Sequence, residues 1–168
     1  MRLIAKLAAI ALLCSVGVLA ASRPPASKRP AAGANQASGG FRPAQLIQPA
    51  ELIKEMKEPK GVRPIILHVG FEFLYQGGHV PGAIFAGPAS RPAGLAKLRQ
   101  TAERIPRNHE VVIYCGCCPM SRCPNIHPAY AALKKMGFQH LLVLNLPTDF
   151  AHDWAMKGFP MSKGSVPR

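Results

Sequence analysis

The chain has 168 residues and a formal net charge of +13, from 21 Lys and Arg against 8 Asp and Glu. This length accommodates one domain with a leader but excludes two full-sized domains. The basic residues are scattered, without long runs of like charge or interleaved aromatic residues. We therefore expect a basic surface that attracts anions and no specific nucleic-acid binding.

Residues 1–20 have the pattern of a secretory signal peptide. A short positively charged start precedes an uncharged, mostly apolar run over 7–21, and Val18 and Ala20 offer small residues for cleavage after position 20. The run is shorter than the about 20 apolar residues of a bilayer span. We therefore expect a periplasmic or secreted protein, with no stable membrane insertion after cleavage; an uncleaved N-terminal anchor is the alternative.

Residues 21–44 are rich in Pro, Ala, Ser and Gly and have almost no large apolar side chain, which predicts a flexible linker. A folded domain is expected over 45–161 and a C-terminal tail over 162–168. The domain opens with a short apolar edge at 46–47, and Pro49 then starts a stretch with apolar residues at helical spacing.

The first half of the domain alternates short apolar runs with helical patterns. Residues 65–69 are almost fully apolar, as in a strand buried on both faces of a sheet, and 71–75 are expected to form one helical turn. A second short strand is predicted at 83–86. Ser90 is then expected to cap a helix whose apolar residues continue at helical spacing.

The second half repeats this alternation. The β-branched and aromatic run at 111–114 predicts the strongest strand, and the helix after it is expected to stop at Gly137. A strand at 141–144 and a last helix over 149–156 complete the pattern. Such alternation predicts an α/β fold, with a parallel sheet flanked by helices on both faces and a ligand site beyond the carboxyl ends of its strands.

Cys115 directly follows the strongest predicted strand, so the fold places it where ligands bind. With Cys117, Cys118 and Cys123 it forms a cluster within nine residues, whereas the only other cysteine, Cys14, lies in the leader. A disulfide framework would spread its cysteines along the chain to join distant segments. The cluster therefore belongs to one local site.

Four features of this domain are similar to those of the rhodanese-like family. Residues 78–83, Gly-His-Val-Pro-Gly-Ala, resemble the family's Gly-His-Ile-Pro-Gly-Ala turn, and a strand that ends in Tyr precedes the loop at Cys115. A helix that ends in Met-Gly-Phe at 136–138 leads into an apolar strand. Trp154 and the segment 157–160, Lys-Gly-Phe-Pro, are similar to the family's C-terminal Trp and Gly-Tyr-Pro.

The resemblance implies a rhodanese-like fold and a sulfurtransferase, in which Cys115 attacks a sulfur donor and holds the sulfur as a persulfide. Backbone N–H groups of the loop and the N-terminus of the next helix would favour the thiolate. Gly116, Ser121 and the other clustered cysteines belong to this loop, and Arg122 is expected to hold an anionic donor. The implied partners are a small anionic sulfur donor or a protein thiol; no cofactor is expected, and the oligomeric state is left open.

Three differences from the family pattern bear on this chemistry. Six residues separate Cys115 from Arg122, more than in the usual sulfurtransferase loop or in the phosphatases that share the fold. The family's Asp-x-Arg after the second strand is replaced by His-Val-Gly at 68–70, and the paired glycines after the last strand are replaced by Leu-Pro at 146–147. These differences leave the fold intact and leave thiosulfate chemistry open.

The extra cysteines favour two other functions beside sulfur transfer. A thiol–disulfide redox protein would use Cys117 or Cys118 to resolve a persulfide or sulfenate on Cys115. A non-catalytic module would bind a partner, or Zn or Cu through the cysteines and His127, although the spacing matches no closed zinc motif. A structural Cys118–Cys123 disulfide that shapes the loop is a further alternative.

Several other residues have both a structural and a functional interpretation. His68, at the end of a strand, is expected either to face the site or to be a hydrogen-bonded histidine. His79 is expected to pack in a turn beneath the loop rather than to carry protons. Trp154 is expected in the core, and Asn125 or Ser121 as the cap of the helix after the loop.

Overall fold

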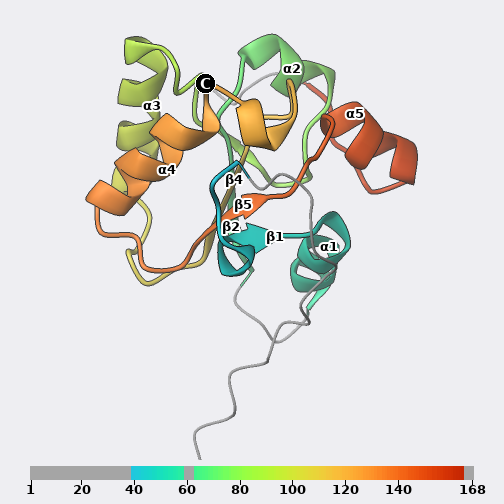
Figure 1. The fold of residues 1–168 in the computed structure, drawn as a ribbon, viewed down its shortest axis with the longest axis horizontal. Coiled ribbons are helices and arrows are strands. Elements are labelled where there is room, and N and C mark those ends of the chain that lie inside the picture. The colour runs from blue at the N-terminus through green and yellow to red at the C-terminus, as the bar shows by residue number, and fades with distance from the viewer. Residues whose placement is uncertain (1–38, 59–62, 165–168) are drawn as a thin grey trace, which may run out of the picture. The chain divides into compact units, whose positions relative to one another are not determined.

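The computed structural model describes residues 39–58 and 63–164 (Figure 1). The predicted signal peptide and most of the predicted linker lie outside these residues. Within the described part of the chain, no helix is long and apolar enough to span a membrane.

Five strands form one parallel sheet in the order β1-β5-β4-β2-β3. The strands are β1 (Leu46–Ile47), β2 (Ile65–His68), β3 (Ile84–Phe85), β4 (Val111–Tyr114) and β5 (Leu141–Leu144). All four residues of β4 and of β5 are buried, because each of these strands has a neighbour on both edges and protein over both faces. The predicted α/β fold with a parallel sheet is therefore confirmed.

Helices and short 3-10 turns connect the strands. The helices are α1 (Pro49–Lys57), α2 (Glu72–Gly77), α3 (Pro92–Glu103), α4 (Ile126–Lys135) and α5 (Phe150–Asp153), and the 3-10 turns are η1 (Pro43–Gln45), η2 (Met120–Arg122) and η3 (Ala155–Lys157). α1 begins at Pro49 as predicted, because proline fixes a helical φ and lacks the N–H that a first turn would leave unpaired. Gly137 follows α4 with a φ of +89°, the left-handed conformation that ends many helices.

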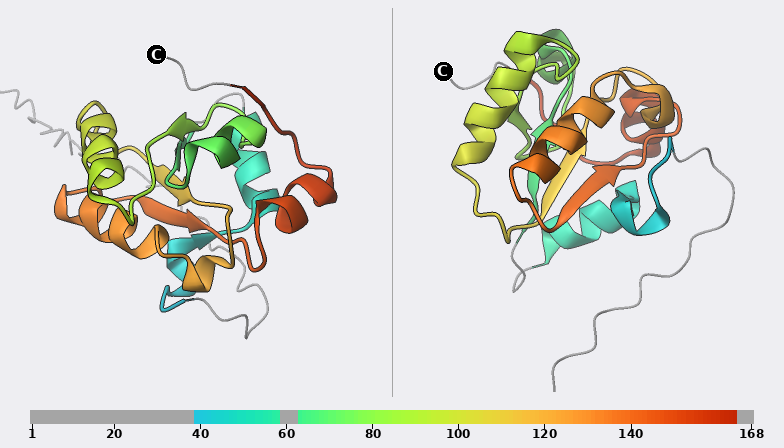
Figure 2. Two further views of the ribbon diagram at one scale, coloured as in Figure 1. Left: turned by 90° about the horizontal axis from the view of Figure 1, so that it is seen from above. Right: turned by 60° about the vertical axis from the view of Figure 1, so that its left-hand side comes forward.

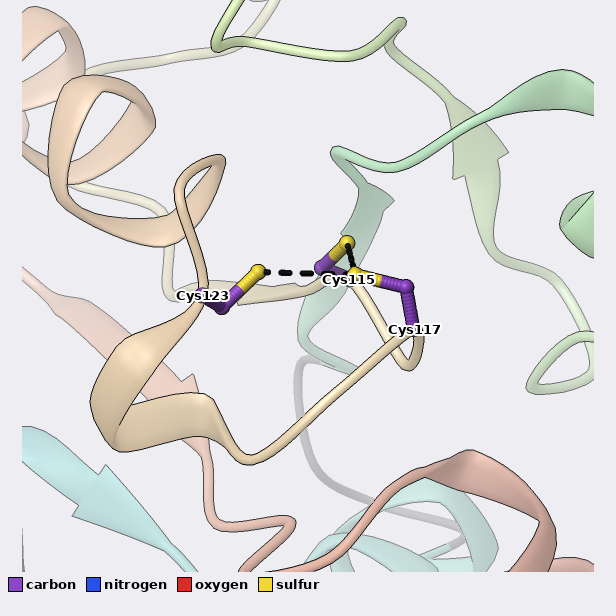
Figure 3. A group of neighbouring side chains, drawn as sticks. All are labelled: Cys115, Cys117 and Cys123. Carbon is purple, nitrogen blue, oxygen red and sulfur yellow. Dashed lines mark hydrogen bonds between the residues drawn. The ribbon is translucent and has the colours of Figure 1, made fainter.

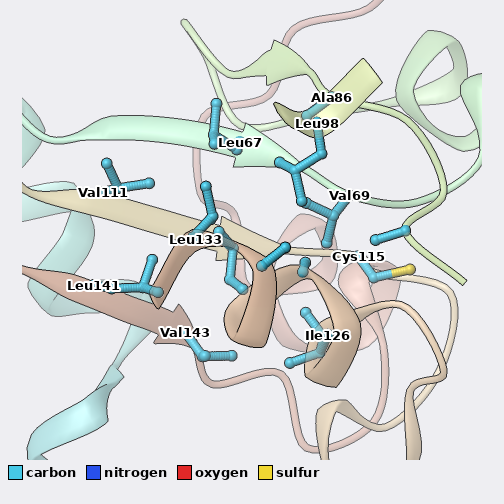
Figure 4. Packing of buried hydrophobic residues seen from close by; sticks show 14 of the residues in the cluster. Leu67, Val69, Ala86, Leu98, Val111, Cys115, Ile126, Leu133, Leu141 and Val143 are labelled. Carbon is cyan, nitrogen blue, oxygen red and sulfur yellow. The ribbon is translucent and has the colours of Figure 1, made fainter. Parts of the chain in front are cut away.

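Two apolar cores lie on opposite faces of the sheet, because successive side chains of a strand point to opposite faces. Val111 and Ile113 belong to the core under α3 and α4, whereas Val112 and Tyr114 belong to the other core with residues of α1 and α2. Figure 4 shows Leu133 of α4 packed over strand residues of the first core, and Figure 2 shows α3 and α4 together on one side of the sheet. Helices therefore cover both faces, as predicted.

Two helix ends differ from their predictions. α3 has Arg91, not Ser90, as its N-cap residue, no side chain caps it, and Pro92 occupies the first helical position. The predicted helix over 149–156 is broken: α5 ends at Asp153, and η3 follows Trp154, whose buried indole donates a hydrogen bond of 2.8 Å to the carbonyl of Pro160. The core position of Trp154 is confirmed.

The folded part extends beyond both ends of the predicted domain. Phe41, inside the predicted linker, is buried and stacks on His127, with ring centroids 4.9 Å apart. Ser162, inside the predicted tail, forms an antiparallel bridge with His79, in which both backbone N–H groups donate over 2.9 Å. The linker prediction missed Phe41 because a single aromatic residue produces no periodic pattern.

Candidate active site

Cys115 lies at the carboxyl end of β4, in the loop that leads to α4, as the sequence predicts. Only 2% of its surface is exposed. Gly116 follows with a φ of +81°, and a Cβ there would come 2.8 Å from Cβ of Phe150, so this turn needs glycine. A Cβ at Gly70 would lie 2.9 Å from Cys115 Sγ. The two glycines therefore let the surrounding backbone close around this sulfur.

The sulfur atoms of the four described cysteines gather at this position, all as free thiols. Cys117 Sγ lies 3.2 Å from Cys115 Sγ, 3.0 Å from Cys118 Sγ and 3.9 Å from Cys123 Sγ. Figure 3 shows Cys115, Cys117 and Cys123 pointing toward one another from the two ends of the loop. The alternative Cys118–Cys123 disulfide is not formed in this structure, since both residues are free.

Asn125 is the main polar partner of Cys115 outside the cluster. Its Nδ2 donates a hydrogen bond of 3.2 Å to Cys115 Sγ, and its Oδ1 accepts one of 2.9 Å from the backbone N–H of Ser90. Asn125 is fully buried, and the Ser90 contact orients the amide so that its NH₂ group faces the sulfur. Asn125 is the N-cap residue of α4, as predicted, but its side chain does not cap the helix, because this amide is engaged elsewhere.

Hydrogen bonds among the sulfurs give the four cysteines different pKa values. Cys115 donates to Cys117, and this bond lowers the pKa of Cys117 to about 5. A hydrogen bond from Cys115 likewise lowers the pKa of Cys123. Hydrogen bonding to Cys117 and Cys123, followed by burial, raises the pKa of Cys115, and burial raises the pKa of Cys118. These shifts make the exposed Cys117 more acidic than the buried Cys115.

A pocket of about 400 Å³ opens beside Cys115 and Cys117. Its other walls come mainly from α2, α5, η3 and the C-terminal segment, and most of them are apolar: Phe73, Leu74, Gly77, Gly78, Phe150, Ala151, Ala155 and Met161. The remaining lining residues are Gly116, His68 and Asp149. Among the described residues, no Lys or Arg lines the pocket, so its one ionic charge besides any thiolate is the carboxylate of Asp149.

His68 lies at the end of β2, lines the pocket and is 1% exposed. Its ring meets those of Tyr114 and Tyr75 edge-on, with centroids 5.0 and 5.6 Å apart. Burial lowers the pKa of His68 to about 4, which keeps the ring neutral at physiological pH, and its Nδ1 is buried without a hydrogen-bond partner. Both interpretations that the sequence leaves open apply, because His68 lines the pocket and also has a hydrogen bond with the backbone of Cys115.

His79 packs in a turn, as the sequence predicts, and does not line the pocket. Its ring stacks on Tyr75 with centroids 3.8 Å apart, and its Nδ1 lies 2.7 Å from the Tyr75 carbonyl oxygen. The backbone bridge to Ser162 holds the C-terminal segment next to this turn. His79 therefore supports the wall that contains Met161 rather than the cysteine cluster.

Arg122 is not brought to the pocket. It is exposed at the end of η2, and within the described part of the chain its guanidinium has no hydrogen bond or ion pair. The long loop inserts this 3-10 turn, in which Met120 points into the core and Arg122 points away from it. Ser121, between them, contacts the N-terminal segment through its backbone, where a Cβ at Gly39 would lie 2.5 Å from Ser121 Cα.

A set of thiols is also the one group of potential metal ligands found in the described residues. Sγ atoms of Cys115, Cys117 and Cys123 lie within 4.8 Å of one another. Cys118 is not a member of this group, and neither is His127, whose exposed ring stacks on Phe41. The arrangement can therefore either react with a sulfur donor as thiolates or hold a soft metal ion.

Comparisons with known proteins agree with this architecture. The family model of the rhodanese-like domain matches residues 48–146, more than half of the chain. A rhodanese-like domain from Anabaena sp. is similar in structure, with a TM-score of 0.52 and 19% identity over 71% of this chain and 79% of that one. A Bacillus halodurans protein gives a TM-score of 0.55 and 19% identity over 71% of this chain and 77% of that one. No curated protein matches the sequence closely enough to count as a relative.

Proposed function

Because this chain belongs to the rhodanese-like domain family, we propose that it is a sulfurtransferase whose Cys115 carries sulfur as a persulfide, with Cys117 as the thiol that first meets the donor. The observation that carries the proposal is the pair of sulfurs 3.2 Å apart at the edge of the pocket, beyond the carboxyl end of β4. One sulfur is exposed and acidic, and the other is buried beneath a fixed amide donor.

The first step uses the Cys117 thiolate. It attacks the outer sulfur of a donor persulfide, R–S–SH, forms a Cys117 persulfide and expels the donor sulfur with the electrons of the broken S–S bond. The proton of Cys115, already donated toward Cys117, passes to the leaving thiolate and gives R–SH. Attack by Cys117 is favoured because its pKa of about 5 makes it a thiolate at neutral pH.

The second step moves the sulfur inward. Once Cys117 is a persulfide, the largest of the causes that raise the pKa of Cys115 is removed, and the thiolate left on Cys115 by the first step is stabilised by the Asn125 amide and by the backbone N–H of Cys117. Cys115 attacks the outer sulfur of the Cys117 persulfide and takes it, and Cys117 leaves as a thiolate. An acceptor thiolate then removes the outer sulfur from Cys115 and restores its thiolate.

The pocket favours a thiol-borne donor over a small dianion such as thiosulfate. Its apolar walls and the Asp149 carboxylate offer no cation to a charged donor, and Arg122 lies elsewhere on the surface. An apolar organic persulfide, or the persulfide of a protein cysteine, can bind against these walls by burying apolar surface without burying a charge. Of the two partner classes that the sequence implies, we therefore propose the thiol class.

Mass spectrometry of the reduced, metal-free protein tests this proposal. After treatment with an alkyl persulfide, we expect one added sulfur atom, mapped to Cys115 and released by cyanide as thiocyanate. In Cys115→Ser the sulfur should stop on Cys117, and in Cys117→Ser loading should slow. The proposal fails if no sulfur is added, or if the added sulfur lies on neither residue; full-rate loading of Cys117→Ser would reject the relay through Cys117.

Thiol–disulfide exchange is a second candidate, favoured by the same short distance. If Cys115 attacks the inner sulfur of a Cys117 persulfide instead of the outer one, the products are a Cys115–Cys117 disulfide and hydrosulfide. A disulfide requires the sulfurs to approach from 3.2 Å to about 2.05 Å. Release of sulfide together with loss of two thiols in the same experiment would select this function.

A further inference from the structure

We propose that Cys115, Cys117 and Cys123 form a three-sulfur binding site for Cu(I). Their Sγ atoms lie within 4.8 Å of one another, and all three are free thiols. This site goes beyond sulfur transfer, because it binds a metal ion without forming or breaking a bond to a sulfur donor. It uses the same loop, so a bound ion would occupy the sulfurs that otherwise react.

The spacing of the sulfurs suits an ion at their centre. Metal–thiolate bonds are about 2.3 Å long, so three sulfurs around one ion lie roughly 4 Å apart. Cys117 and Cys123 are already 3.9 Å apart, all three sulfurs lie within 4.8 Å of one another, and the 3.2 Å between Cys115 and Cys117 has to widen. Cys117 is the exposed member and can make this adjustment by rotating its side chain.

The surroundings select a soft ion. Cys115 and Cys123 are 2% and 1% exposed, and the group contains no histidine or carboxylate. Beside Cys115, Cys118 and Cys123, the loop encloses a small cavity whose other walls are Gly116 and apolar or thioether side chains: Met120, Ile126, Leu144 and Leu146. Ligands of sulfur alone, with no oxygen or nitrogen donor beside them, favour Cu(I) or Zn(II) over Mg²⁺, Ca²⁺ or Mn²⁺.

The number of sulfurs then favours Cu(I) over Zn(II). Structural zinc is almost always bound by four tetrahedral ligands, whereas Cu(I) is satisfied by two or three thiolates. Cys118 would be the fourth; its sulfur lies 3.0 Å from Cys117 Sγ, but it does not belong to the group whose sulfurs all lie within 4.8 Å of one another. His127 cannot replace it, since its ring is stacked on Phe41.

Anaerobic titration of the reduced protein with Cu(I), in competition with a chromophoric Cu(I) chelator, tests this site. We expect one tightly held equivalent, with three sulfur neighbours and no nitrogen neighbour by X-ray absorption. Cys117→Ser and Cys123→Ser should each weaken Cu(I) binding by more than roughly tenfold. A loss of that size is typical when a residue that only supports a metal ligand is removed, so a lost ligand should cost more. Cys118→Ser should bind as tightly as the wild type and is the matched control; circular dichroism verifies that each variant is folded.

Three outcomes would overturn the site. They are failure to compete with the chelator, an equal loss of affinity in Cys118→Ser and Cys117→Ser, and tighter binding of Zn(II) than of Cu(I) with four sulfur neighbours. Sulfur loading of the metal-free protein is measured separately, so failure of the copper site and failure of the proposed sulfur transfer are distinguishable. If both hold, one equivalent of Cu(I) should block loading, and removal of the copper by the chelator should restore it.

Discussion

The side-chain amide of Asn125 joins the buried cysteine to a distant segment: its Nδ2 donates to Cys115 Sγ over 3.2 Å, while its Oδ1 accepts from the N–H of Ser90 over 2.9 Å. The amide cannot turn around without losing both bonds. A hydrogen-bond donor is therefore held against Cys115 Sγ at all times, although Cys115 has a raised pKa before the donor persulfide reacts. This arrangement prepares the site for charge that develops on Cys115 only after Cys117 has reacted.

Replacing the Asn125 amide should impair the transfer of sulfur from Cys117 to Cys115. Asn125→Asp keeps the oxygen that Ser90 needs but removes the NH₂ group, so a charged Cys115 loses a hydrogen bond of about 1.5–3 kcal/mol. We expect transfer onto Cys115 to slow by about tenfold to hundredfold, with persulfide accumulating on Cys117. Time-resolved peptide mapping measures this, and Asn145→Asp, at an asparagine outside the site, is the control. Unchanged transfer would show that the amide has only a structural role.

The pH dependence of thiol labelling should identify Cys117 as the acidic cysteine. Its pKa of about 5 makes it a thiolate at about pH 6, where a typical cysteine with a pKa of about 8.5 is almost fully protonated. We expect iodoacetamide to label Cys117 first in the reduced, metal-free protein, with a rate that falls as the pH drops through about 5.

The same experiment on Cys115→Ala tests the cause of this acidity. The hydrogen bond from Cys115 is the largest contribution that lowers the pKa of Cys117, so its loss should move the midpoint of labelling to higher pH. Alanine is preferred to serine here because a serine hydroxyl would still donate. Preferential labelling of Cys118 at about pH 6, or an unchanged midpoint, would contradict the assignment, since burial raises the pKa of Cys118.

Burial of His68 should make the protein less stable in mild acid. The pKa of His68 is lowered from 6.5 to about 4, so between these values the unfolded chain binds a proton that the folded chain does not. The free energy of unfolding should therefore fall as the pH drops below about 6.5 and level off near 4, by up to about 3 kcal/mol from this group. Urea unfolding at several pH values measures the slope. His68→Leu should flatten it over this range; an equally steep slope in the variant would assign the acid sensitivity to other groups.

The charge of Asp149 should exclude anionic donors. Asp149→Asn removes a carboxylate from the pocket but keeps an oxygen for the N–H of His152, which the wild-type side chain caps over 2.8 Å. We expect sulfur loading from thiosulfate to rise severalfold, because the repulsion between two nearby like charges in water costs about 1 kcal/mol. Loading from an uncharged alkyl persulfide should barely change. A comparable gain with both donors would indicate a change in the pocket's shape rather than in its charge.

The sequence by itself determined the strands, the parallel sheet and the place of Cys115, because these follow from local patterns. The apolar run of β4 fixes a buried strand, and the residue after it must lie at the sheet's carboxyl edge. Pro49 and Gly137 mark helix ends through their own backbone preferences, which no distant contact has to supply. The rhodanese-like domain could be recognised for the same reason.

Only the tertiary structure decided how the site is built around Cys115. Arg122 is directed away from the pocket and Asn125 toward the sulfur by the packing of a loop whose path no periodicity predicts. The apolar pocket walls come from α2 on one side and from α5 and the C-terminal segment on the other, which are more than 70 residues apart in the chain and meet only when the domain folds. Which cysteine carries the charge likewise depends on burial and on sulfur–sulfur distances, and these are set by three-dimensional contacts rather than by order along the chain.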